Sequence, residues 1–178
     1  MTKKPEFSAR EIRYKRVFLL DALPAPLTRA DEHWQIFDDY TAWPEFRLRQ
    51  IRVPQSREWF VAREEIIISE VETGIKEEIT RAILPAGDAG ADGPHPEKEI
   101  RKNRYFLEDV VIDVFLGSLW GLILAEISFA DEPAMSRFSP PPFATIEVSS
   151  QKFFRGENLA AANFEEVKKE FGKIINRE

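Results

Sequence analysis

Charged side chains interrupt four apolar, β-prone runs between residues 100 and 149. Lys102 and Arg104 lie in the first run, and the later runs contain Asp113, Glu126 and Glu147. Successive side chains of a strand point to opposite faces, so Lys102 and Arg104 point the same way. Several strands that each turn charges to one side predict a sheet wrapped around a polar interior. Such an interior is suited to bind a charged ligand.

The first half of the chain shows the same alternation. In residues 10–20, Arg13 and Lys15 share a face with Glu11, and the opposite face is largely apolar. In residues 46–53, Arg47 and Arg49 share a face. The predicted interior is therefore lined mainly by cationic side chains, which favours an anionic ligand.

Composition limits the classes of protein that fit. The chain has 178 residues, 43% of them hydrophobic, which suits one folded domain over residues 1–178. A net charge of −6 argues against duplex nucleic acid as a partner, and the lack of cysteine excludes disulfides and thiolate metal sites. The longest apolar run is well short of the roughly 20 residues that span a bilayer. No signal peptide is evident, so we expect a cytoplasmic protein without a membrane partner.

Periodicity predicts the elements that position these residues. Strands are expected at 10–20, 46–53, 58–68, 101–106, 110–116, 122–130 and 145–149. Helices are expected at 28–40, from Ser69 to about residue 83, where apolar residues recur every four positions, and at 158–175. A polar loop rich in Gly and Pro is expected over 85–99. The prediction is an antiparallel β structure with three flanking helices.

Ordered fragments along nearly the whole chain resemble the CYTH, or triphosphate tunnel metalloenzyme, superfamily. They are Arg47-Leu-Arg49, Lys102-Asn-Arg104-Tyr105, Asp113-Val-Phe115-x-Gly117, Leu119-x-Gly121-Leu122, Ala125-Glu126, Glu147-Val148-Ser149 and Leu159-Ala160. The resemblance implies an α+β fold, a closed eight-stranded antiparallel β-barrel with flanking helices. It also implies that the barrel forms a tunnel for triphosphates.

The resemblance also implies roles for the tunnel residues. Arginine and lysine would hold the phosphates, and we assign this role to Arg47, Arg49, Lys102 and Arg104, helped by Arg63, Lys15 and Arg13. Carboxylates would hold Mg²⁺ or Mn²⁺, and we assign the metal to Glu126, Glu147 and Asp113, the first two also being catalytic. No organic cofactor is expected.

Two acidic motifs of the family are altered here. The family opens with Glu-x-Glu-x-Lys, whereas this chain reads either Glu11-x-Arg13-x-Lys15 or, without a gap, Arg13-x-Lys15-x-Val17. The later Glu-x-Glu strand reads Glu126-Ile127-Ser128. A fixed positive charge at Arg13, about 6 Å from a divalent ion, would cost on the order of 5 kcal/mol at an effective dielectric near 20. We therefore expect the tunnel to hold an anion well and a metal poorly.

Three functions remain open. The first is a module that binds a triphosphate-bearing small molecule or polyphosphate, with metal-dependent hydrolysis weakened or lost. The second is an active divalent-metal-dependent triphosphatase; a class IV cyclase would need the same lost acids. The third is a structural or partner-binding protein with a relic tunnel, which collapse of Arg13 onto Glu126 would support. A homodimer is a further expectation.

Overall fold

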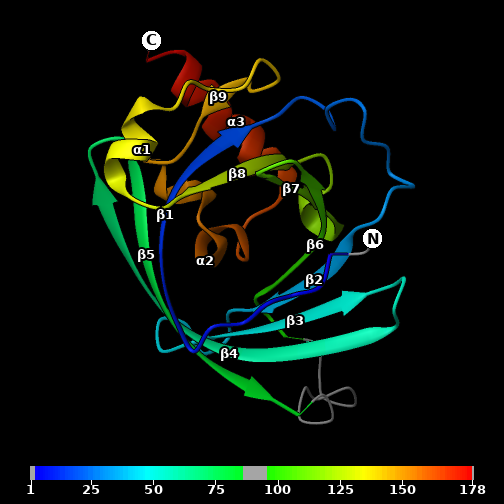
Figure 1. Cartoon of the computed structure of the whole chain (residues 1–178). Coiled ribbons are helices and arrows are strands. Elements are labelled where there is room, and N and C mark those ends of the chain that lie inside the picture. The colour runs from blue at the N-terminus through cyan, green and yellow to red at the C-terminus, as the bar shows by residue number, and fades with distance from the viewer. Residues whose placement is uncertain (1–2, 86–95, 178) are drawn as a thin grey trace.

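Eight strands close into an antiparallel barrel in the computed structural model, which describes residues 3–85 and 96–177 (Figure 1). The strands are β1 (Arg10–Leu19), β2 (Trp34–Asp39), β3 (Arg47–Val53), β4 (Glu58–Val71), β5 (Gly74–Leu84), β6 (Glu99–Leu107), β7 (Val110–Phe115) and β8 (Ile123–Phe129). Their order is β5-β4-β3-β2-β6-β7-β8-β1, and β1 also pairs with β5. The predicted barrel is confirmed. Residues 86–95 of the predicted polar loop lie outside the described residues.

Strand β1 closes the barrel by pairing with a different neighbour along each half. Residues 10–15 pair with β5, and residues 14–19 pair with β8. A ninth short strand, β9 (Ile146–Glu147), pairs with the end of β1 at Phe18 and Leu19. Closure leaves one continuous inner face, to which alternate residues of every strand point.

Two of the predicted helices are strands instead. Residues 34–39 of the helix expected at 28–40 form β2, which pairs on both sides with β3 and β6. The helix expected from Ser69 is the β4–β5 hairpin, with its turn at Glu72 and Thr73. The recurrence of Ile75, Ile79 and Ile83 every four residues misled the prediction because four is also an even spacing, which keeps side chains on one face of a strand.

The helices lie in the last third of the chain. They are α1 (Glu132–Arg137), α2 (Gly156–Leu159) and α3 (Phe164–Ile175), with short 3-10 turns η2 (Gly117–Leu119) and η3 (Lys152–Phe154). The helix expected at 158–175 is therefore split. Asn163 begins α3, because its side chain accepts the N–H of Glu166 while the Glu166 carboxylate accepts the N–H of Asn163. Helix α1 was not predicted.

Apolar residues fill the barrel on either side of a polar middle. One cluster joins inward residues such as Leu19, Phe115 and Leu124 to Leu159 of α2 and Val167 of α3. A second cluster is formed by Ile36, Ile51 and Val53, with Phe7 packed against it. The C-terminal segment thus closes one end of the barrel, as Figure 1 shows. No helix within the described residues is long and apolar enough to cross a membrane.

Candidate anion site in the barrel

The barrel encloses a cavity whose charged lining residues are mainly cationic. Seven cationic residues line it: Arg13, Lys15, Arg47, Arg49, Lys102, Arg104 and Arg155. Three acidic residues share the wall: Glu77, Glu126 and Glu157. An excess of positive charge in a partly enclosed space attracts anions, since low-dielectric walls strengthen the field.

Strand alternation places six of these cations. Arg13 and Lys15 project inward from β1, Arg47 and Arg49 from β3, and Lys102 and Arg104 from β6. The seventh, Arg155, lies between η3 and α2 and enters from the closed end.

Buried carboxylates on neighbouring strands hold two of the arginines. Arg49 donates two hydrogen bonds to Asp38, from Nε and Nη2, each of 2.7 Å. Arg104 donates two to Asp113, of 2.7 and 2.8 Å, and Lys102 Nζ lies 2.7 Å from the same carboxylate. Each guanidinium has five N–H donors, so a two-point bond fixes its plane and leaves other donors to face the cavity.

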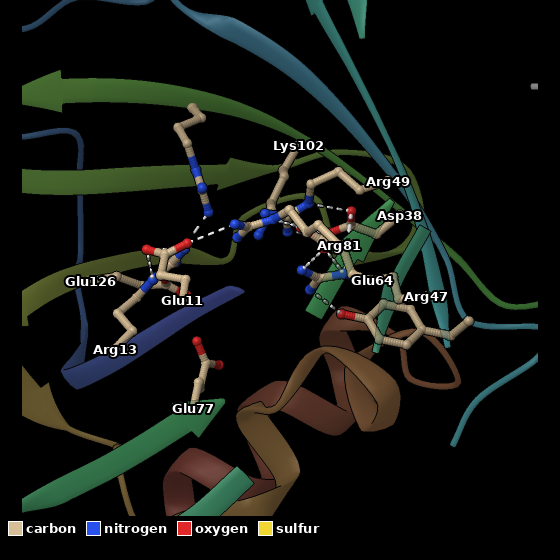
Figure 2. A network of polar contacts seen from close by, with 12 residues as sticks. Glu11, Arg13, Asp38, Arg47, Arg49, Glu64, Glu77, Arg81, Lys102 and Glu126 are labelled. Carbon is tan, nitrogen blue, oxygen red and sulfur yellow. Dashed lines mark hydrogen bonds and ion pairs between the residues drawn. The ribbon is translucent and has the colours of Figure 1, made fainter. Parts of the chain in front are cut away.

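A longer chain of ion pairs orients Arg47 and Arg13 (Figure 2). Arg47 pairs with the buried Glu64 and donates 3.1 Å to the Tyr40 hydroxyl. Arg81 donates one hydrogen bond of 2.7 Å to Glu64 and another of 2.7 Å to Glu11. Glu11 in turn accepts two hydrogen bonds of 3.1 Å from Arg13. The network therefore runs from β3 through β4 and β5 to β1, across the wall of the barrel.

The ion pairs keep the buried carboxylates charged. Burial alone raises a carboxyl pKa, but Arg49 and Arg47 hold the pKa of Asp38 well below its usual range. At Glu126, burial is likewise outweighed by Lys15 and Arg104, and the pKa lies well below its usual value. Burial lowers the pKa of Lys102, which Asp113 only partly offsets.

Lys15 lies between two of the three acidic wall residues. Its Nζ lies 2.8 Å from Glu77 and 3.3 Å from Glu126. In the barrel, Lys15 stands opposite Ser128 on one side and Ile75 on the other, so both acids are its diagonal neighbours. An ammonium thus already satisfies both carboxylates.

A divalent metal, which the family resemblance implies, does not fit these residues. Hard cations need several oxygen ligands. Within the described part of the chain, no group of three or more Asp, Glu or His side chains is arranged to hold a metal ion. The two wall acids near each other are bridged by the Lys15 ammonium, and Asp113 is enclosed by Lys102 and Arg104.

The structure brings together most, not all, of the residues predicted from the sequence. Six of the seven predicted cations and Glu126 line the cavity. Arg63 does not: it is half-exposed on β4, near Glu65 and over the Phe46 ring. Asp113 does not line it either: it is 1% exposed and shares the inner face of the barrel with Arg104, its cross-strand partner.

Glu147 is not part of a metal cluster, contrary to the prediction that grouped it with Glu126 and Asp113. The two carboxylate oxygens of Glu147 accept hydrogen bonds of 2.9 and 2.7 Å from Arg16, whose side chain points away from the cavity. The reason is the pairing of β9 with the end of β1, which sets Glu147 opposite Phe18 and beside Arg16. Arg13 does not collapse onto Glu126 either, since its hydrogen bonds go to Glu11.

Sequence reasoning missed five members of the site. Asp38, Glu64, Glu77, Arg81 and Arg155 were not identified. For β5 a signal existed, because Ile75, Glu77, Ile79 and Arg81 are spaced two residues apart and would share one face of a strand. No comparable signal marked Arg155.

The acid limb of the stability curve should depend on Glu64. Burial raises its pKa, but Arg47, Arg49 and Arg81 outweigh burial and set the pKa at about 2, against 4.5 ordinarily. Its stabilising contribution is thus complete above about pH 4.5 and is lost as the pH falls towards 2. We expect the free energy of unfolding of the wild type to fall by about 3 kcal/mol more than that of Glu64→Gln between pH 5 and 2.

Denaturant titrations at several pH values check this, with Glu65→Gln as the matched control. Glu65 is the next residue on β4 and is exposed, and it should keep the wild-type pH dependence. Equal slopes for wild type and Glu64→Gln would show that this carboxylate is not held charged by the arginines.

Comparison with known proteins shows relatives of the same architecture. Over 124 residues the chain is 32% identical to the inorganic triphosphatase of Nitrosomonas europaea, an alignment that covers 65% of this chain and 74% of that protein. The crystal structure of the inorganic triphosphatase NE1496 matches with a TM-score of 0.57 at 23% identity, covering 84% of this chain and 95% of the other. A crystal structure of the hypothetical protein NE1496 matches with the same TM-score. No protein-family model matches the chain.

Proposed function

Since this chain belongs to the CYTH, or triphosphate tunnel, superfamily, we propose that its barrel binds a triphosphate-bearing small molecule or polyphosphate without a divalent metal. The observation that carries the proposal is the cavity wall, with seven cationic residues against three acidic ones. Inorganic triphosphate serves as the probe, because the phosphates are the part that all ligands of this class share.

The phosphate contacts come from paired positions on three strands. Arg47 and Arg49 on β3 stand on the wall with Lys102 and Arg104 on β6, and β1 adds Arg13. Asp38, Glu64 and Asp113 fix the guanidiniums before the ligand arrives, so little side-chain freedom is lost on binding. These buried acids also reduce the net charge of the site, which keeps the ligand-free barrel stable.

Hydrolysis is weakened in this proposal because the acids that would hold a metal are engaged. A bound divalent ion would polarise the phosphate and help to generate the attacking hydroxide. Here Lys15 bridges Glu77 and Glu126, and Arg16 holds Glu147. The cations of the wall bind and orient the anion, and none of these three carboxylates is left free to act as a base towards water.

The second candidate is an active metal-dependent triphosphatase. It is favoured by one observation, the presence of Glu77 and Glu126 close together on the cavity wall, on either side of Lys15. If an incoming phosphate drew Lys15 away, both carboxylates would become available to a metal.

Phosphorus-31 NMR of inorganic triphosphate separates the two candidates. We expect shifted or broadened triphosphate signals on addition of the protein, with or without Mg²⁺ or Mn²⁺, and no new signals. Metal-dependent orthophosphate and pyrophosphate signals would establish the triphosphatase instead. Unchanged spectra under all conditions would contradict both.

Arg47→Ala should weaken triphosphate binding at least about tenfold, because a charge-assisted hydrogen bond contributes about 1.5–3 kcal/mol. The fold should tolerate the change, since Glu64 keeps its partner Arg81. Arg63→Ala is the matched control, as Arg63 is exposed on the neighbouring strand and outside the cavity. Calorimetric titration measures both. Equal affinity of Arg47→Ala and wild type would place the ligand elsewhere.

A further inference from the structure

Arg155 differs from the other cations of the cavity wall in its origin. The other six project from strands of the barrel, whereas Arg155 belongs to the segment that closes one end, between η3 and α2. Gly156 brings this segment close to the wall, because a Cβ at this position would lie 1.8 Å from the Tyr40 hydroxyl oxygen. That hydroxyl accepts a hydrogen bond from Arg47, so Arg155 is held next to the cation network.

Arg155 also differs in its hydrogen bonding. Its Nη2 donates a hydrogen bond of 3.0 Å to Glu70, a half-exposed residue of β4. Only 16% of the Arg155 side chain is exposed. Its Nε is buried and has no hydrogen-bond partner among the described residues. A buried donor without an acceptor is unfavourable unless something else supplies the acceptor. Because Arg155 lines the anion cavity, we take the acceptor to be the ligand.

We propose that Arg155 is a direct ligand-binding residue, whose Nε donates a hydrogen bond to a phosphate oxygen of the anion at the closed end of the barrel. Glu70 accepts a hydrogen bond from the neighbouring Nη2 and so fixes the position of the guanidinium on the cavity wall. This inference rests on the proposed function, and it adds that the C-terminal segment takes part in binding as well as in closing the barrel.

The ligand-free protein should not need Arg155 for stability. Replacing it with methionine, Arg155→Met, removes a buried donor that has no partner and keeps most of the apolar stem. We expect the thermal midpoint of the free variant to equal or exceed that of the wild type, while the shift of the midpoint by inorganic triphosphate shrinks. A purely structural role would give the reverse, a lowered midpoint and an unchanged shift.

Calorimetric titration with inorganic triphosphate gives the affinity. Arg155→Met should bind about tenfold or more weakly than the wild type, and Arg155→Lys, which keeps the charge but lacks Nε, should fall between them. Lys152→Ala is the matched control, because Lys152 also lies near Glu70, at 3.9 Å, but is exposed and outside the cavity. It should bind within about twofold of the wild type.

The outcomes distinguish this inference from the proposed function. If the wild type binds and Arg155→Met binds equally well, the role of Arg155 is overturned while anion binding by the barrel stands. If Lys152→Ala weakens binding as much as Arg155→Met, the effect is general surface charge and the inference also fails. If the wild type does not bind at all, both proposals fail.

Discussion

Asp113→Ala should lower the free energy of unfolding by about 3–5 kcal/mol, the largest stability change that we expect from one substitution in the site. Asp113 is 1% exposed and holds both Lys102 and Arg104, themselves buried. Its removal leaves two positive charges close together in the interior without the carboxylate that compensates them. Chemical denaturation monitored by tryptophan fluorescence measures the loss.

A second variant tests the stated cause. In Asp113→Ala combined with Lys102→Met, one of the two uncompensated charges is gone, and part of the lost stability should return. The exposed Asp21 provides the control, since Asp21→Ala should change stability by no more than about 0.5 kcal/mol. If the double variant were as unstable as the two single losses added together, burial of unpaired charge would not be the cause.

Lys15→Met should create a metal site where the wild type has none. The substitution removes the ammonium that lies 2.8 Å from Glu77 and 3.3 Å from Glu126, and the two carboxylates on either side of β1 then lose their shared cation. At an effective dielectric near 20, a unit charge about 4 Å from a divalent ion costs about 8 kcal/mol, so its removal should be felt strongly. Because Arg104 and Arg13 remain nearby, we expect a gain in Mn²⁺ affinity of at least about tenfold.

Electron paramagnetic resonance of free Mn²⁺ measures this gain directly and does not depend on any catalytic activity. Lys76→Met is the matched control, since Lys76 is on the outer face of β5 and pairs there with Glu78. It should leave Mn²⁺ binding unchanged. Tight binding of Mn²⁺ by the wild type, or no gain in Lys15→Met, would mean that Lys15 does not stand in for the metal.

The cationic wall could be predicted from the sequence because it depends on local alternation. Arg47 and Arg49 share a face of β3, and Lys102 and Arg104 share a face of β6, wherever those strands lie. A two-residue period can be recognised within a few residues. The barrel itself was predicted from the resemblance to the CYTH superfamily.

The carboxylates that pair with these cations could not be predicted in the same way. Asp38 and Glu77 lie in segments whose apolar spacing fits a helix as well as a strand, and only pairing with neighbouring strands decides between the two. The pairing of each acid with its base also depends on contacts between strands that are far apart in the sequence. The register of β1 sets Lys15 diagonal to Glu126, and the addition of β9 draws Glu147 to Arg16 on the other side of the strand.

Calorimetric titration of the wild-type protein with inorganic triphosphate in the presence of a chelator tests the central claim most directly. We predict saturable binding of one anion per chain, unchanged when the chelator is replaced by Mg²⁺, because the cations that hold the phosphates belong to the protein. Binding that is absent with the chelator and appears only with Mg²⁺ or Mn²⁺ would contradict the claim and restore the metal to the site.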